Sequence, residues 1–497
     1  MLDELKQEAN RARTENGALT NRSSGSELLD LFATVGALRH AAAEEITARF
    51  VRAWAEDRDL AMKLLFYARD VRGGLGERRV FRVLLRYLAA HEPASLQKNL
   101  ARVPEYGRWD DLLCLLDTPL RFDTVALVRR QLGEDLAALG KPDAPVSLLG
   151  KWLPSINAHD RETVRLGREL AAELGMTERA YRKTLTLLRA RIRLLENSLR
   201  ERDYSFDYER QPARALFKYR AALLRSDGAR CRDYLNRVAL GRARLHTGTL
   251  LPYELVEPLL SPDGYREGLG FLKPLTPDEA LALNTAWAAL EDFATDENAL
   301  AVVDTSASMH WGEPPRPASV ALSLGLYFAE RAKGPYRNHF IEFSAHPELI
   351  ELRGETFADR LRYIASFRKP ANTNLSAVFE LILSAAVRCG LPQAELPRRL
   401  YVISDMEFDA AVDGADRTVL ESAAASYAAH GYELPQLVFW NVGSRRRQQP
   451  VTVNDHGVAL VSGCSPRIFS MVTGGVLEPC GWMLAVLQSP RYAEITA

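Results

Sequence analysis

The hydrophobic pattern of this 497-residue chain changes near residue 297. Between Ser26 and about Leu290, apolar residues recur every three or four positions, as in the stretches that begin at Glu27 and Val80. This spacing is typical of amphipathic helices. After residue 297, short apolar runs alternate with helical stretches, which is typical of a mostly parallel sheet covered on both faces. The sequence therefore predicts an α-helical domain followed by a doubly wound α/β domain.

The predicted domains follow this change of pattern. Residues 1–25 are polar and predict a flexible N-terminal arm. Residues 26–296 predict the helical domain, whose many medium-length helices suit a stack of helical repeats, and residues 297–497 predict the α/β domain. The expected strands of that domain are Leu300–Val303, His339–Phe343, Leu400–Ser404, Leu437–Trp440 and Val458–Ser462, and its expected helices include Ala318–Glu330 and Leu375–Leu383.

Composition excludes several classes of protein. Hydrophobic residues make up 47% and charged residues 26%, an ordinary globular balance. The sequence contains no run of 18 apolar residues, so it predicts no transmembrane helix. The first residues lack the apolar core of a secretory signal. The five cysteines are scattered, without a C-x-x-C pair, which favours a reducing compartment and disfavours a zinc site. We therefore expect a cytoplasmic protein without a membrane partner.

The net charge of zero hides an uneven distribution. Residues 181–250 contain 17 Lys and Arg against 7 Asp and Glu, whereas residues 251–300 contain 2 basic and 10 acidic side chains. A basic stretch of this kind is a candidate anion-binding surface. The alternative is a set of solvated helix faces whose arginines point to water.

An oxygen-rich motif follows the first predicted strand. Asp304, Ser306 and Ser308 form a D-x-S-x-S sequence at the carboxyl end of that strand, the edge where doubly wound sheets bind ligands. Thr373, before a predicted helix, and Asp405, at the end of another strand, offer further oxygens. Such hard donors suit Mg²⁺ or another divalent cation. The alternative is a cluster that caps the next helix, because Asp and Ser cap well.

The order and placement of these five residues resemble the metal-ion-dependent adhesion site (MIDAS) of von Willebrand factor A (vWA) domains, over about residues 297–485. The resemblance implies that Ser306, Ser308 and Thr373 touch the ion and that Asp304 and Asp405 hold it mainly through water. It also implies an open coordination position that an acidic group of a partner fills. Residues Ala371-Asn372 and Met406-Glu407 depart from the pattern, since many vWA domains have glycines there.

The helical half resembles the Ro autoantigen family, known as the TROVE module. The strings that carry this resemblance are Tyr67-Ala-Arg-Asp-Val-Arg-Gly-Gly-Leu-Gly-Glu-Arg and Pro104-Glu-Tyr-Gly-Arg-Trp-Asp-Asp-Leu. An uncharacterised family of vWA-containing relatives is closer, with hallmarks that appear here as Lys151-Trp-Leu-Pro-Ser-Ile-Asn, Tyr181-Arg-Lys-Thr-Leu, Ser404-Asp-Met-Glu-Phe and Phe439-Trp-Asn-Val. The resemblance implies a HEAT-like α-helical repeat ring closed by a vWA-like domain. It further implies binding of single-stranded RNA ends or small structured RNAs, in RNA processing or quality control.

Basic and aromatic side chains supply the candidate RNA contacts. Lys and Arg neutralise phosphates, and aromatic rings stack on unpaired bases. The candidate RNA-binding residues are Lys63, Arg69, Arg72, Lys151, Arg182, Lys183, Lys218, Arg220, Arg244 and His246. The aromatic candidates are Tyr204, Phe206, Tyr208, Phe217 and Tyr219. The alternative is that the rings belong to the core and that each cation is an ordinary surface charge.

The sequence offers little sign of an enzyme. It has no H-E-x-x-H, G-x-S-x-G or Walker A motif, and His310 is the nearest candidate base to the two serines. We therefore expect no catalytic residues. The expected function is an RNA-binding protein with a Mg²⁺-dependent site for a protein partner. The alternatives are a Mg²⁺-dependent protein-interaction scaffold without RNA and a metal-dependent hydrolase. A closed single-chain ring also predicts a monomer.

Overall fold

The computed structural model describes residues 1–142, 144–260, 272–343, 346–365, 374–409, 418–444, 446–472 and 477–497. Within these ranges, no helix combines the length and the apolarity that crossing a bilayer requires. The contacts divide the chain into two compact units. Residues 1–42, 51–57 and 212–489 form one, and residues 43–50, 58–211 and 490–497 form the other. We call them the sheet unit and the helical unit. The domain boundary expected at residue 297 stays a prediction.

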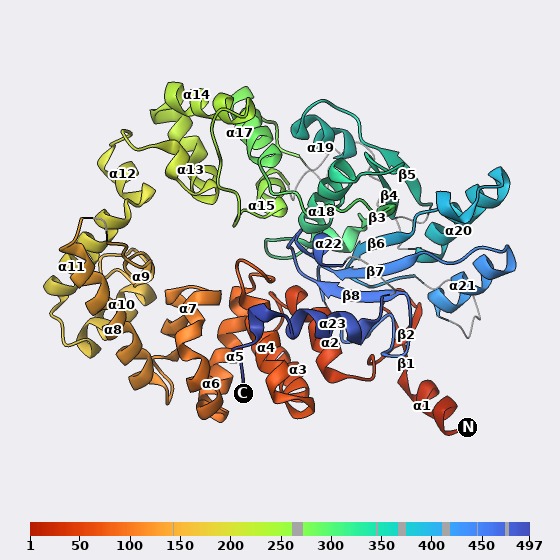
Figure 1. Cartoon of the computed structure of the whole chain (residues 1–497), viewed down its shortest axis with the longest axis horizontal. Coiled ribbons are helices and arrows are strands. Elements are labelled where there is room, and N and C mark those ends of the chain that lie inside the picture. Colours follow the sequence, from red (N-terminus) through yellow and green to blue (C-terminus); the bar gives the residue numbers. More distant parts are fainter. Residues whose placement is uncertain are drawn as a thin grey trace. The chain divides into compact units, whose positions relative to one another are not determined.

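The helical unit consists of short and medium-length helices in sequence order (Figure 1). They are α4 (Arg58–Arg69), α5 (Arg78–His91), α6 (Pro93–Asn99), α7 (Val103–Tyr106), α8 (Arg121–Leu139), α9 (Leu149–Trp152), α10 (Arg161–Glu173), α11 (Glu178–Ile192) and α12 (Leu195–Glu201), and α3 (Ala43–Glu56) begins in this unit. Each buries one apolar stripe: in α5, Val80, Leu84 and Leu88 are buried, and Arg78 and Arg86 lie on the opposite face.

The sheet unit contains a six-stranded sheet of order β5-β4-β3-β6-β7-β8. Its strands are β3 (Ala299–Asp304), β4 (His339–Phe343), β5 (Glu348–Glu351), β6 (Arg399–Ser404), β7 (Gln436–Asn441) and β8 (Val458–Ser462). All neighbouring pairs are parallel except β4 and β5. The five strands expected from sequence are present. The antiparallel edge strand β5 was not expected, because only Ile350 of its four residues is buried and it offers no apolar run.

Helices cover both faces of this sheet. All six residues of β3 are buried, and successive side chains of a strand point to opposite faces, so neither face of β3 is open to water. The helices of the unit are α1 (Leu2–Asn10), α2 (Glu27–Thr34), α13 (Ala213–Ser226), α14 (Gly228–Ala239), α15 (Pro252–Val256), α17 (Pro277–Ala288), α18 (Pro317–Arg331), α19 (Phe357–Ala365), α20 (Leu375–Cys389), α21 (Val419–Ala429), α22 (Ile468–Met471) and α23 (Pro479–Leu487). Helix α18 packs against β3, β4 and β6, and α2 packs against β8.

The N-terminal segment differs from the flexible arm expected over residues 1–25. It forms α1 and an antiparallel hairpin of β1 (Arg11–Arg13) and β2 (Leu19–Asn21). The hairpin is held by backbone hydrogen bonds between Asn21 and Gln449, 3.1 and 2.8 Å long. Polar composition had suggested disorder, but here the polar groups bond to a segment more than 400 residues away, which local pattern does not reveal.

Candidate cation site and basic surface

The candidate cation site lies at the carboxyl edge of the sheet. Strand β3 ends at Asp304, and its parallel neighbour β6 ends just before Asp405, with Val303 paired to Ile403 in register. Since parallel neighbours end at the same edge, the two carboxylates are brought together from positions about one hundred residues apart. This is the edge at which the D-x-S-x-S motif predicted a site.

Hydrogen bonds link the oxygen-bearing side chains of this edge. The Ser308 hydroxyl donates to Asp405 Oδ2 at 3.0 Å, and the Ser306 and Ser308 hydroxyl oxygens lie 3.1 Å apart. The Ser306 backbone N–H donates to Asp304 Oδ1 at 2.9 Å, and the Ser404 hydroxyl donates to Asp304 Oδ2 at 2.6 Å. The structure therefore brings together four of the five predicted ligands. Thr373 lies outside the described residues.

The two carboxylates of the site disfavour each other's negative charge. Asp304 is fully buried, and burial, followed by the nearby charge of Asp405, raises the pKa of its carboxyl group. A cation would offset both effects. Two carboxylates and two hydroxyls form the hard-oxygen donor set that suits Mg²⁺. Within the described part of the chain, no three His, Cys, Asp or Glu side chains gather as metal ligands do, so a site here depends on the serine hydroxyls.

Two residues at this edge were missed as site residues. Ser404 is fully buried and orients Asp304; its position at the end of an apolar strand, directly before Asp405, was the available signal. Glu407 was noted only as a departure from glycine. Its buried carboxylate accepts hydrogen bonds from the Glu15 backbone N–H at 2.7 Å and from Gln448 Nε2 at 3.0 Å, and burial raises its pKa. Glu407 thus fastens the N-terminal hairpin beside the candidate site.

Six of the ten candidate RNA-binding residues lie in the helical unit, and one of them is wrong. Arg69 is 1% exposed and its Nε lies 2.8 Å from Asp111, so its guanidinium is not presented to a phosphate. The sequence could not show this, because its buried partner lies 42 residues away. Lys63 and Lys151 are half-buried, and Lys151 Nζ lies 5.3 Å from the centroid of the Trp152 ring.

The other three candidates of the helical unit are exposed. Arg72 donates to the Glu105 carbonyl at 2.9 Å. Arg182 and Lys183 lie side by side in sequence on α11. These two are therefore the members of this group that are best placed to meet an anion from solvent.

The remaining four candidates lie in the sheet unit. Lys218, Arg244 and His246 are exposed. Arg220 is half-buried against the Phe217 ring, 4.1 Å from its centroid, and burial lowers the pKa of its guanidinium. Among the aromatic candidates, Tyr208 is buried; the others, Tyr204, Phe206, Phe217 and Tyr219, are half-buried.

The two Ro-like strings contact each other in the helical unit. Asp111, from the second string, accepts from Arg69 at 2.8 Å and from Arg82 at 2.7 Å. Asp110 pairs with Arg78 at 2.5 Å and with Arg82 at 2.9 Å. This network joins α4, α5 and the 3-10 helix Trp109–Leu115, so the acidic residues of these strings hold the fold together.

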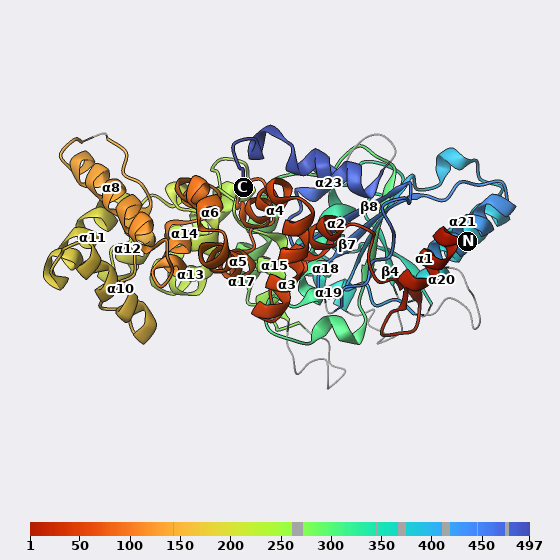
Figure 2. The same cartoon turned by 90° about the horizontal axis from the view of Figure 1, so that it is seen from below.

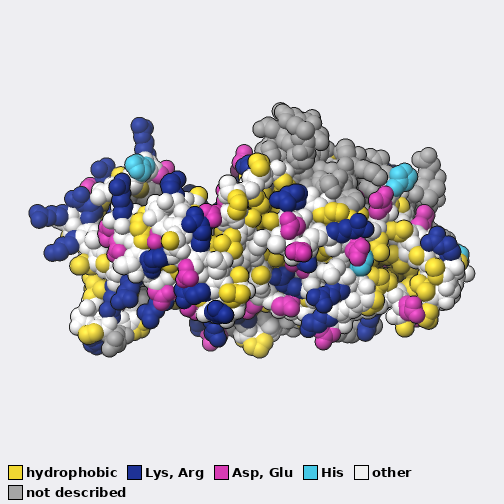
Figure 3. Space-filling model, turned by 90° about the horizontal axis from the view of Figure 1, so that it is seen from above, with side chains coloured by type: hydrophobic (Ala, Val, Ile, Leu, Met, Phe, Trp, Pro, Cys, Tyr) yellow, Lys and Arg dark blue, Asp and Glu magenta, His cyan; other side chains and the backbone are white. Residues whose placement is uncertain are grey.

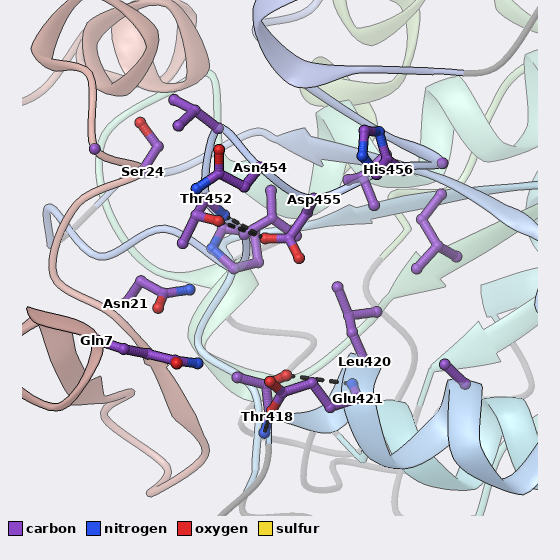
Figure 4. A pocket seen from close by; sticks show the side chains of 18 of the residues that line it. Gln7, Asn21, Ser24, Thr418, Leu420, Glu421, Thr452, Asn454, Asp455 and His456 are labelled. Atoms are coloured by element: carbon purple, nitrogen blue, oxygen red, sulfur yellow. Dashed lines mark hydrogen bonds between the residues drawn. The ribbon is translucent and has the colours of Figure 1, made fainter. Parts of the chain in front are cut away.

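A separate cavity of about 940 Å³ lies in the sheet unit (Figure 4). It is lined by the N-terminal segment, the first turns of α21 and residues 450–458, and by none of the four predicted cation ligands that the structure describes. Asn21 is 8% exposed and extends toward the cavity, and Asp455 accepts hydrogen bonds from the backbone N–H and hydroxyl of Thr452 at 2.6 and 2.9 Å.

Comparison with known proteins finds a curated relative and a solved structure that match over nearly the whole chain. The chain is 27% identical over 521 residues to "Uncharacterized protein L728" of Acanthamoeba polyphaga mimivirus, covering 97% of this chain and 88% of that protein. Among solved structures, the Ro (RSR) protein of Deinococcus radiodurans matches over 94% of this chain and 93% of that chain, with 15% identity and a TM-score of 0.35.

Two domain families match the sequence, and neither is the TROVE module. The "Domain of unknown function (DUF7788)" matches residues 298–478, which contain the candidate cation site. The "Domain of unknown function (DUF2828)" matches residues 14–125 and 120–300, more than half of the chain. The chain therefore belongs to the DUF2828 family.

Proposed function

We propose that the sheet unit carries a cation-dependent adhesion site of the vWA kind, which binds Mg²⁺ and, through it, an acidic group of a protein partner. The convergence of Asp304, Ser306, Ser308 and Asp405 on one edge of the sheet carries this proposal. The proposed role is one of binding, because all four side chains can act as oxygen donors to one ion.

Each residue of the site has a distinct part in this proposal. Ser306 and Ser308 offer hydroxyl oxygens to the ion, and Thr373 is proposed as a third such ligand. Asp304, held by Ser404, and Asp405, held by Ser308, supply the negative charge that compensates the ion. With few protein ligands, Mg²⁺ keeps coordination positions for water or for a partner carboxylate.

The direct test is calorimetric titration of the purified chain with MgCl₂. Asp405→Asn keeps the shape of the side chain but removes its charge, so we expect Mg²⁺ affinity to fall at least about tenfold. Asp233→Asn, an exposed carboxylate on α14, is the matched control and should bind like the wild type. The proposal would be contradicted if the wild-type chain does not bind Mg²⁺ at millimolar concentration, or if the Asp405→Asn variant binds Mg²⁺ with unchanged affinity.

We also propose that the helical unit binds RNA, as part of a HEAT-like ring of the Ro kind with a role in RNA processing or quality control. The observation that favours this second function is a basic surface. Figure 3 shows Lys and Arg side chains gathered over the end of the helical unit that carries α8, α10, α11 and α12. In the described structure, Arg182 and Lys183 of α11 have no acidic partner.

Binding of a fluorescein-labelled 20-nucleotide single-stranded RNA tests the second function. Phosphate contacts release counterions, so affinity should fall steeply as KCl rises, with a log–log slope of about −0.7 for each contact. Reversing the charge of Arg182 and Lys183 should weaken binding, whereas Asp405→Asn should not. No micromolar binding at low salt would leave the Mg²⁺-dependent scaffold without RNA as the better account.

A further inference from the structure

Two arginines end adjacent helices in an unusual backbone conformation. Arg193 follows α11 with φ 55° and ψ 54°, and Arg202 follows α12 with φ 55° and ψ 29°. This left-handed conformation brings the Cβ of an L-residue close to the following carbonyl oxygen, so the position favours glycine.

Other helices of the same chain obey that preference. Gly175, just after α10, has φ 71°, and Gly241, just after α14, has φ 69°. Gly390 and Gly431, just after α20 and α21, have φ 61° and 78°. The backbone at residues 193 and 202 would therefore be served better by glycine, and the arginine side chains must be explained by something else.

No described residue bonds to the guanidinium group of Arg193 or of Arg202. Both side chains are exposed, and neither makes a hydrogen bond or an ion pair with any described residue. Both acids that flank Arg202 in sequence are engaged elsewhere: Glu201 pairs with Arg200 at 2.8 Å, and Asp203 accepts a hydrogen bond from the Ser205 backbone N–H at 2.9 Å. A cation at a helix C-terminus gains only a little from the helix dipole, and both exposed guanidinium groups stay available to a ligand outside the chain.

Arg193 continues a row of cations along α11. Arg179, Arg182 and Lys183 lie on one exposed face of α11, opposite the buried Tyr181 and its neighbours, and the exposed Arg193 follows at the C-terminal end of the helix. Fourteen residues separate the ends of this row, which is roughly 21 Å at the helical rise. In both views, α11 lies beside α8, α10 and α12 at one end of the helical unit (Figures 1 and 2).

Half-buried aromatic side chains follow the second arginine. Tyr204 and Phe206 come two and four residues after Arg202, and the Phe206 ring lies 4.9 Å from that of the buried Tyr208. Cations beside partly exposed rings suit a strand whose bases are unpaired, because phosphates meet the cations and bases stack on the rings. A polyacidic peptide would use the cations alone.

We infer that the exposed face of α11, extended by Arg193, Arg202, Tyr204 and Phe206, is the contact surface for single-stranded RNA. This inference rests on the proposed RNA-binding function and names its surface. Two of the surface residues, Arg193 and Arg202, were not among the candidate RNA-binding residues. Arg193 and Arg202 are phosphate contacts, and the two aromatic side chains are stacking positions.

The test is the double variant Arg193→Gly/Arg202→Gly. Glycine relieves the left-handed backbone, so the unfolding midpoint should stay the same or rise. Affinity for a labelled U20 RNA at 50 mM KCl should nevertheless fall several-fold, and the salt slope should become shallower by about 1.4, or 0.7 for each lost contact. The lysine variant Arg193→Lys/Arg202→Lys keeps the charges and should bind nearly as tightly as the wild type.

Arg337→Ala/Arg388→Ala is the matched control, because it removes the same charge from exposed positions of the sheet unit and should leave the slope unchanged. If the wild type binds RNA and the glycine variant binds it equally tightly, the inferred surface is wrong, while the proposed RNA-binding function stands. No wild-type binding would overturn both. Equal binding of poly-glutamate, with no effect of Tyr204→Leu/Phe206→Leu on RNA affinity, would identify a surface for acidic proteins instead and would also overturn the inference.

Discussion

At the scale of single residues, Asp70 shows how one buried carboxylate orders its surroundings. Asp70 is fully buried in the helical unit and accepts hydrogen bonds from Arg491 Nε at 2.8 Å, from the Tyr492 hydroxyl at 3.1 Å and from the Arg72 backbone N–H at 2.9 Å. Burial alone would raise its pKa, but these bonds, led by that from Arg491, outweigh burial and lower it. Asp70 belongs to a Ro-like string, and its role here is structural.

Replacing Asp70 by Asn should therefore destabilise the chain in a pH-dependent way. A lowered pKa stabilises the folded state above the unfolded value, near 3.9, and the stabilisation is lost as pH falls through the folded value. We expect Asp70→Asn to cost about 2 kcal/mol at pH 7, since hydrogen bonds to a charged group are lost. Urea unfolding at pH 7 and at about pH 3 should show a smaller acid loss in the variant. Equal losses would contradict this assignment.

At the scale of elements, the turn between α4 and α5 depends on one glycine. Three backbone hydrogen bonds close this turn: Gly74 N–H to Asp70, Leu75 N–H to Tyr67 and Glu77 N–H to Ala68, at 3.1, 3.1 and 2.7 Å. A Cβ at Gly74 would overlap the Tyr67 carbonyl oxygen. The glycine-rich string therefore serves the close approach of two helices.

Alanine at Gly74 should disrupt this helix pair. We expect Gly74→Ala to destabilise the chain by about 2–3 kcal/mol, because the clash is with backbone that cannot move aside. Gly133→Ala is the matched control: nothing lies within 4 Å of that Cβ, and alanine inside α8 should stabilise by up to about 1 kcal/mol. Thermal unfolding of both variants measures the difference in stability. An unchanged unfolding midpoint in Gly74→Ala would contradict this prediction.

At the scale of the whole molecule, the two compact units are not consecutive in sequence. The helical unit includes residues 490–497, which follow the last helix of the sheet unit. Tyr492 packs near the rings of Tyr67 and Tyr106, 6.0 and 5.8 Å between centroids, and Tyr106 donates to the Arg491 carbonyl at 2.5 Å. The C-terminal residues are thus part of the core of a unit that is otherwise built from the first half of the chain.

Truncation after Ser489 should consequently loosen the helical unit and spare the sheet. The variant loses every partner that Arg491 and Tyr492 provide, so amide exchange should accelerate in α4 and α7. Strands β3 and β6 should exchange at wild-type rates, which is the internal control in a hydrogen-exchange experiment. Faster exchange in the sheet alone would contradict this prediction, because it would mean that residues 490–497 stabilise the sheet unit and not the helical unit.

Local pattern was sufficient for much of the α/β half. Five strands, the two named helices and the oxygen-rich edge were predictable because apolar periodicity and a strand-end D-x-S-x-S are properties of neighbouring residues. Strand order was not predictable in this way, because the right-handed connection of parallel strands does not decide which strands are neighbours. Asp304 and Asp405 meet because β3 pairs with β6.

Local sequence pattern was enough to predict the helical and the α/β parts of the chain, the succession of strands and the donor atoms of the candidate cation site. Only the tertiary structure decided that Arg69 is buried against Asp111, that a polar N-terminus is a hairpin bonded to Gln449, and that Arg193 and Arg202 occupy left-handed positions. The physical reason is the distance along the chain. Periodicity records which face of a segment is buried, whereas burial of a charge depends on a partner brought from elsewhere by the fold.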